Sequence, residues 1–112
     1  METPMSAATP VVVLTTLPLG SDAIAFARTL VSERLAACVS VLSPMQSIYQ
    51  WQGTIEETQE RQVLIKTVAE HVPALDARVR TLHPYDVPEF LVLPVADGGA
   101  RYLAWVRDST MV

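Results

Sequence analysis

The apolar positions of this chain switch between runs typical of strands and spacings typical of helices. Residues 10–17 form a continuous, mainly β-branched run, which predicts a strand buried on both faces. Ser21 can cap a helix that follows, with the carboxylate of Asp22 near the positive end of its dipole. Five apolar side chains at helical spacing predict the buried face of that helix: Ile24, Ala27, Leu30, Val31 and Leu35.

The middle of the chain predicts a long β-hairpin. Residues 38–42 and 47–51 are extended in pattern, and Pro44 between them predicts a bulge or an edge because it cannot donate to a ladder. The Gln-Gly pair at 52–53 suits a tight turn, after which residues 54–67 return as the partner strand.

The last third of the chain predicts a second helix, a fourth strand and a terminal helix. Pro73 suits the first turn of a helix, and Pro84 ends it. Residues 89–95 predict the fourth strand, and the glycine pair at 98–99 leads into a short helix. The apolar face of the second helix is expected to consist of Val72, Leu75, Val79 and Leu82.

The resulting order, β-α-β-β-α-β with an extra C-terminal helix, predicts an α+β fold. Right-handed crossovers favour one antiparallel sheet with both main helices on a single face, which is the ferredoxin-like sandwich. We expect residues 1–9 to be a flexible N-terminus and residues 10–112 to form one domain.

The predicted hairpin is too long for a single subunit to cover. An arm of about fourteen residues reaches roughly 45 Å, whereas a compact chain of this length is roughly 34 Å across. Its tip carries Ile48, Tyr49, Trp51 and Ile55, which would be exposed on an isolated ribbon. Packing against a neighbouring subunit would cover them, so we expect Ile48, Tyr49 and Trp51 in an oligomer interface. The alternative is a shorter hairpin folded over its own core.

Charge and cysteine usage exclude several classes of function. The 112 residues carry 12 acidic and 8 basic side chains, a net charge of −4, and Lys66 is the single lysine. Nucleic-acid binding normally needs clustered Lys and Arg, so no nucleic-acid partner is expected. The lone Cys38 excludes an internal disulfide and a thiolate cluster within one subunit.

Apolar runs in the chain are short. The run at 11–14 follows a segment without positive charge, and Pro18 interrupts it early, so it lacks the features of a signal peptide. No other run is long enough to span a bilayer. We therefore expect a soluble, intracellular protein with no membrane partner.

Four segments resemble, in order and spacing, the CutA family of divalent-cation tolerance proteins. They are LAACV at 35–39, SIYQW followed by Gly53, LIKT at 64–67, and HPYDVPE at 83–89. The resemblance covers nearly the whole chain, from Val11 to Val106. Each segment alone is a weak signal, but four in register are specific.

The resemblance implies a ferredoxin-like subunit in a tight homotrimer, with long hairpins crossing to neighbours. It also implies a cytoplasmic protein linked to copper and other divalent cations, without an accepted enzymatic reaction. The architecture is similar to that of the PII signalling trimers, which leaves an alternative function open. In that alternative the clefts bind a small anionic ligand, and the hairpins contact an unknown protein partner.

The metal ligands of the family carry over only in part. Some members use a cysteine at the end of the first strand and a His-His pair before the Pro-Tyr, and here those positions hold Thr15, Leu82 and His83. Only His83 matches, so the resemblance implies weak binding of Cu²⁺ or another divalent cation, with carboxylates or water completing the shell. Cys38 is the other candidate ligand.

Each candidate residue also has a purely structural interpretation. His83 could interact with a helix C-terminus instead of lining a cleft with Tyr85 and Glu89. A free cysteine in such a position is commonly a small buried hydrophobe, which is the structural interpretation of Cys38. Lys66 could extend from an edge or pair with Glu89, or it could bind an anion in the cleft.

An acidic stretch follows the turn, and we interpret it as a solvated face of the hairpin; it consists of Glu56, Glu57 and Glu60. The alternative is that these carboxylates attract cations loosely, with low affinity and strong salt dependence.

Catalysis is not expected. An acylphosphatase-like enzyme on this fold needs a basic loop between the first strand and the first helix, whereas residues 17–22 contain no basic residue and include an acid. Cys38 and His83 are not linked by any recognisable nucleophile–base motif.

Overall fold

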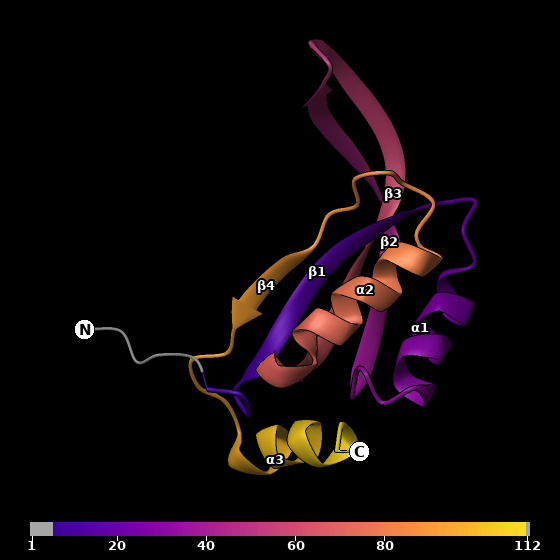
Figure 1. The fold of residues 1–112 in the computed structure, drawn as a ribbon. Helices are drawn as coiled ribbons and strands as arrows, with labels where there is room; N and C mark the ends of the chain where they lie inside the picture. The colour runs from indigo at the N-terminus through magenta and orange to yellow at the C-terminus, as the bar shows by residue number, and fades with distance from the viewer. Residues whose placement is uncertain (1–5, 112) are drawn as a thin grey trace.

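Four strands form one sheet in the computed structural model, which describes residues 6–111. Their order is β2-β3-β1-β4, and the three neighbouring pairs are antiparallel. This is the ferredoxin-like arrangement that the element order predicts (Figure 1). The strands are β1 Pro10–Pro18, β2 Cys38–Trp51, β3 Thr54–Val68 and β4 Leu91–Pro94.

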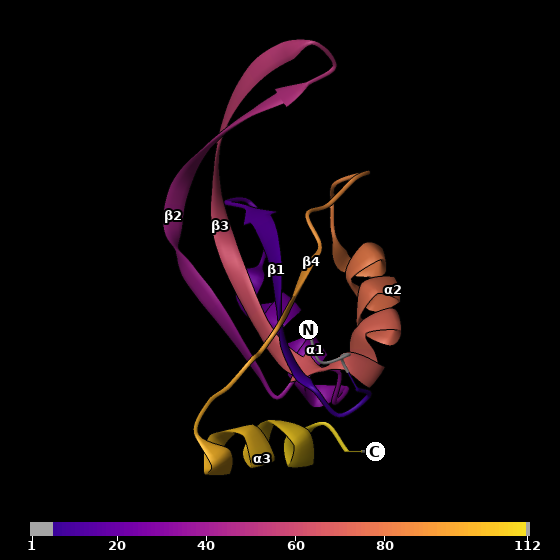
Figure 2. The same cartoon turned by 90° about the vertical axis from the view of Figure 1, so that its left-hand side faces the viewer.

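Helices cover one face of the sheet. α1 (Ala23–Ser32) and α2 (Val72–Leu82) lie side by side on this face, and a short 3₁₀ turn, Ala69–His71, precedes α2 (Figure 1). α3 (Ala100–Ser109) lies at the end of the sheet where β1 begins, in contact with β1 and β3 (Figures 1 and 2).

The core lies between the sheet and the two main helices. Burial of one such aliphatic side chain contributes about 1.5–3 kcal/mol. The residues buried there come from the two central strands and both helices, and the larger ones are Val11, Val13, Leu17, Phe26, Leu30, Val63, Ile65, Leu75 and Val79.

The predicted buried face of α1 is wrong in part. Ala23, Phe26 and Leu30 are buried, whereas Ile24 and Val31 are exposed. α1 is apolar on more than one side, and the stripe that contains the large ring of Phe26 packs against the sheet. The cap is also one residue later than predicted, because Asp22 Oδ1 accepts a hydrogen bond of 2.9 Å from the Ala25 amide.

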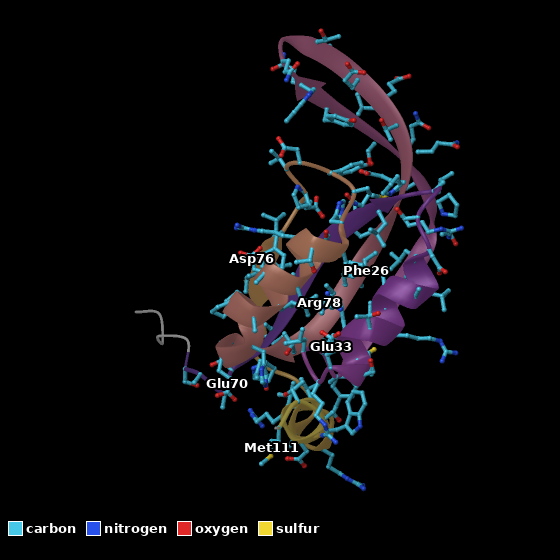
Figure 3. All side chains as sticks on the ribbon, turned by 45° about the vertical axis from the view of Figure 1, so that its right-hand side comes forward. Phe26, Glu33, Glu70, Asp76, Arg78 and Met111 are labelled. Carbon is cyan, nitrogen blue, oxygen red and sulfur yellow. The ribbon has the colours of Figure 1, made fainter. Side chains whose placement is uncertain are left out.

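The predicted face of α2 is confirmed. Leu75 and Val79 are fully buried, and the flanking Val72 and Leu82 pack against the same core. Outside the core, Arg78 joins the two helices, with Nε donating to Glu33 Oε1 and Nη2 to Oε2, both at 2.9 Å. Figure 3 shows this ion pair between α1 and α2.

β4 is shorter than the predicted strand at 89–95. Its residues pair with only four residues of β1, from Val11 to Leu14. Glu89 and Phe90 precede the strand, and Val95 adds a single amide hydrogen bond to the carbonyl of Pro10.

The long central hairpin is confirmed. β2 has 14 residues and β3 has 15, but β1 pairs with β3 only from Glu60 to Val68. The hairpin beyond this point, residues 44–59, is called the distal arm, and Figure 2 shows it extending past the rest of the molecule. The radius of gyration is accordingly 14.9 Å, against about 13 Å for a compact chain of this length.

Two registers meet within the hairpin. At its base Val41 pairs with Val63, whereas beyond the bulge Pro44 pairs with Arg61, which is a shift of one residue. The tip is a turn with positive φ at both central residues, 50° at Gln52 and 80° at Gly53, as a type I′ hairpin requires. The predicted bulge at Pro44 and turn at 52–53 are both confirmed.

The chain before β1 is hydrogen-bonded to the domain where it is described. The amide of Glu70 donates to the carbonyl of Ala7, and Arg107 Nε donates to the carbonyl of Ala8. The remainder of the N-terminus predicted to be flexible, residues 1–5, lies outside the described residues.

Candidate functional site

A cavity of about 760 Å³ lies between the distal arm and the segment that joins α2 to β4, residues 83–90. Its apolar wall is partly aromatic and partly aliphatic, and its polar groups are mainly carboxylates and an amide. The lining residues that matter below are Thr16 of β1, Met45, Ile48, Tyr49, Trp51, Glu60 and Gln62 of the hairpin, and Tyr85, Asp86, Val87 and Glu89 of the segment.

The register of the distal arm decides which side chains share the face of Glu60. Paired residues on adjacent strands point to the same face. Because Met45 pairs with Glu60 and Trp51 pairs with Thr54, the odd-numbered residues of β2 share the face of Glu60 in this half. The Tyr49 hydroxyl accordingly lies 3.1 Å from the Thr58 hydroxyl. Tyr49 and Trp51 thus form an aromatic stripe on the face of Glu60, between Glu60 and the tip of the hairpin.

Glu60 is the least exposed carboxylate of the described chain, at 8%. Its Oε2 accepts one hydrogen bond, at 3.3 Å, from the phenol of Tyr85. Within residues 6–111 no Lys, Arg or His forms an ion pair with it. The prediction that Glu60 belongs to a solvated acidic face is therefore wrong, because it pairs with Pro18 at the end of β1 and lies inside the sheet.

The phenol of Tyr85 remains protonated at neutral pH. Burial raises the pKa of Tyr85, and the negative charge of Glu60 raises it further. Tyr85 therefore acts as a hydrogen-bond donor to Glu60.

Glu89 and Gln62 close the polar side of the cavity. Gln62 Nε2 donates to Glu89 Oε2 at 2.9 Å and to the carbonyl of Thr15 at 2.8 Å. Of the alternatives for Lys66, pairing with Glu89 is therefore excluded. With Asp86 exposed nearby, the cavity contains three carboxylates, and none of its described lining residues is Lys, Arg or His.

His83 is buried behind the cavity wall. Its Nε2 must carry a proton, because it lies within hydrogen-bond distance of the Thr16 carbonyl, which can only accept. Nδ1 then accepts a hydrogen bond of 3.1 Å from the Tyr85 amide. The neutral ring thereby fixes the start of segment 83–90 against β1. A metal-ligand role for His83 stays a prediction, and it requires the ring to give up its bond to Tyr85.

Cys38 and Lys66 lie elsewhere. They pair with each other near the base of the hairpin, and neither lines the cavity. Cys38 Sγ is 3.8 Å from the Ser40 hydroxyl. Lys66 Nζ is 5.6 Å from the centre of the Tyr102 ring, and the interaction with Tyr102 raises the pKa of Lys66. The sequence could not predict this contact, because Lys66 and Tyr102 are far apart in the chain and only the folded structure brings α3 against β3.

The two positions that depart from the family's metal ligands face away from the cavity. Thr15 is fully buried on the helix-covered side of the sheet, and Leu82 packs against the same core. Within residues 6–111, no three His, Cys, Asp or Glu side chains are placed to hold a metal ion. The structure therefore unites Ile48, Tyr49, Trp51, Tyr85 and Glu89 around the cavity, and it leaves Cys38 and Lys66 outside.

Comparison with known proteins agrees with this fold. The family model for the CutA1 divalent ion tolerance protein matches residues 11–109. The chain belongs to the CutA1 family. It is 48% identical over 99 residues to the divalent-cation tolerance protein CutA of Thermus thermophilus, covering 88% of this chain and 96% of that protein.

Solved CutA structures superimpose closely on this chain. CutA from Xylella fastidiosa is 44% identical, with a TM-score of 0.88 over 92% of this chain and 99% of that one. A protein from Archaeoglobus fulgidus, described as a periplasmic divalent cation tolerance protein CutA, is 27% identical, with a TM-score of 0.86 over 91% and 99% of the two chains.

Membership in CutA1 makes this chain a divalent-cation tolerance protein and not an enzyme, as predicted. Among the described residues, no helix has the length and apolar character needed to cross a bilayer.

Sequence reasoning missed Glu60 and Gln62 as cavity residues. Together with Leu64 and Lys66 they occupy every second position of β3, so the sequence alone indicated that these four residues share one face of the strand. Which part of that face lines the cavity follows only from the pairing of β3 with β1 and from the position of the distal arm.

Proposed function

We propose that this CutA-family protein is a cytoplasmic homotrimer that responds to divalent cations and binds them weakly, Cu²⁺ included, in clefts between subunits. The carboxylate-lined cavity under the distal arm is the part of such a cleft that one chain contributes. The observation that carries the proposal is the buried, negatively charged Glu60, which has no cationic partner among the described residues.

The donor set of the cavity fits a weak cation site. Carboxylate and amide oxygens suit divalent cations, and affinity for a given oxygen or nitrogen site rises toward Cu²⁺ across the first-row metals. Glu60 and Glu89 would hold the ion, with Asp86 at the rim. Because one chain supplies no three-ligand cluster among residues 6–111, water or a neighbouring subunit would complete the shell.

The distal arm supports the homotrimer. Ile48 is 65% exposed and Ile55 is 70% exposed, and Tyr49 and Trp51 are also exposed. Residues 54–59 have a pairing partner on one side only. A two-stranded ribbon with this much apolar surface is marginal in water unless a neighbour covers it.

An anion-binding function like that of PII proteins has less support. The carboxylates of the cavity would repel an anion, and Lys66 lies outside the cavity beside Tyr102.

Isothermal titration with Cu²⁺ and Mn²⁺ tests the cation site. Both should bind weakly, with Cu²⁺ tighter, and Glu60→Gln and Glu89→Gln should each lower affinity by about tenfold or more. Glu57→Gln is the matched control, because it removes the same charge from the opposite face of β3, and it should leave affinity nearly unchanged. Equal affinity for all four proteins would reject this site.

A His83→Gln variant tests the histidine separately. Unchanged copper affinity would exclude His83 as a ligand and leave the carboxylate site standing. Analytical ultracentrifugation of the unmodified protein tests the trimer.

A further inference from the structure

We propose that the cavity also binds an aliphatic diamine, with one primary ammonium group at Glu60 and the carbon chain along the aromatic stripe. This ligand is of a different class from a metal ion. The proposal rests on the proposed function in that the cavity is one chain's part of the cleft between subunits, but it does not depend on metal binding. It rests on the size of the cavity, on its aromatic wall and on the placement of its carboxylates.

The cavity is larger and more apolar than a metal ion requires. Its volume of about 760 Å³ lies within the roughly 300–1,000 Å³ of typical small-molecule sites. Met45, Ile48 and Val87 line it together with three aromatic side chains. A hydrated cation would gain little from these groups, whereas an alkyl chain would bury its surface against them.

Glu60 offers the kind of acceptor that an ammonium group needs. Its carboxylate is more than nine-tenths buried, and the one hydrogen bond it accepts comes from the neutral phenol of Tyr85, at Oε2. A primary ammonium satisfies a carboxylate through a charge-assisted hydrogen bond and, unlike a metal ion, needs no cluster of three protein ligands.

Aromatic rings on the same face as this carboxylate favour an organic cation. Tyr49 and Trp51 share the face of Glu60, and Tyr85 lies on the opposite wall. The faces of such rings attract ammonium groups even where the rings are partly exposed, as Tyr49 at 43% and Trp51 at 47% are in the single chain. Basic side chains, which would compete for these sites, are missing from the described lining residues.

The carboxylates lie on both walls, which favours a ligand with two charges. Glu60 belongs to the hairpin, whereas Asp86 and Glu89 belong to segment 83–90. A diamine can place one ammonium at each wall, and a monoamine of equal length can satisfy only one wall. Chain length is therefore expected to matter.

Fluorescence titration of the full chain with butane-1,4-diamine tests the proposal. Trp105→Phe serves as the background, so that Trp51 is the one remaining tryptophan reporter. Diamines of three to six carbons are compared with butylamine and with butane-1,4-diol. We expect saturable quenching by a diamine of preferred length, about tenfold weaker binding of butylamine, and no binding of the diol.

Variants separate this site from the metal site. Glu60→Gln should weaken diamine binding about tenfold. Tyr49→Leu should weaken diamine binding several-fold and leave Mn²⁺ affinity unchanged, because a hydrated metal does not use the ring. Glu57→Gln again serves as the charge control.

Three results would overturn the proposal. One is quenching that Mg²⁺ at equal ionic strength reproduces, which indicates general screening of charge. Another is diamine affinity that Tyr49→Leu and Glu60→Gln leave unchanged. The third is binding of lysine-containing peptides with no binding of any free diamine. Loss of Mn²⁺ binding alone would reject the metal site and leave the diamine site intact.

Discussion

The two halves of the central hairpin are built from the same two strands but are stabilised differently. In the half near the body, Val63 and Ile65 are fully buried, because β1 continues the sheet and two helices cover it. In the distal arm, Ile48 and Ile55 are exposed, and β3 has a neighbour on one side only. The first half is stabilised within the chain, whereas the second is left with exposed apolar side chains that no part of the described chain covers.

The largest expected effect tests the half near the body. Ile65→Ala should lower the free energy of unfolding by about 2–5 kcal/mol, because it opens a cavity in a closely packed core. Urea denaturation measures the change. Ile24→Ala is the matched control on the outer face of α1, where the side chain is 60% exposed, and it should change stability by less than about 0.5 kcal/mol. Similar losses in both variants would mean that the core is misplaced.

The next effect tests the distal arm. Ile48→Asp should weaken subunit association by about 2 kcal/mol, because it places a charge in a desolvated apolar contact. Sedimentation velocity over a range of protein concentrations measures the shift toward monomer. Ile24→Asp introduces the same charge at a site of similar exposure and should not change the oligomeric state. Equal behaviour of the two variants would argue against an interface at the arm.

A smaller effect is expected at the tip. Gly53 has φ of +80°, so Gly53→Ala should destabilise the turn by about 1 kcal/mol. Hydrogen exchange of the amides of residues 51 and 54 reports it locally, while exchange in the core should not change. Gln52→Asn is the control, because Asn-Gly is favoured in a type I′ turn, and protection there should be kept or increased.

The smallest effect concerns alkaline pH and the contact between the two walls of the cavity. The folded pKa of Tyr85 is raised above its usual value of 10.0. The stability that its neutral phenol contributes is thus fully present below pH about 10 and is lost as pH rises through the folded value. Tyr85→Phe should remove this part of the alkaline loss in urea titrations at a series of pH values. Tyr49→Phe removes another phenolic hydroxyl from the same cavity, and this variant should retain the alkaline loss of stability.

Local patterns were enough to predict the architecture. Strand runs, the turn at Gly53, the bulge at Pro44 and the α2 face around Leu75 and Val79 all depend on residues close together in sequence. The α1 face was harder, because Ile24 and Phe26 both mark plausible apolar stripes. Only packing against the sheet distinguishes them.

The site depended on contacts between distant residues. His83 is bonded to the carbonyl of Thr16, and Glu60 to the phenol of Tyr85, in each case across tens of residues. No local pattern reports such a pairing. Tyr85 and Glu89 were predicted because they belong to the motif at 83–89, whereas Glu60 was interpreted as part of a charged surface.

The bulge between Val41 and Pro44 separates the chemistry of the cavity from the direction of the arm. The turn at 52–53 sets which side chains face Glu60, counting back from the tip. The extra residue in β2 bends and twists the strand, so it determines where the arm points. Deletion of Ser43 would restore regular pairing and redirect the arm while leaving the same side chains beside Glu60. In this hairpin, a change in strand length alters how far and in which direction the arm extends, and a substitution alters what the cavity binds.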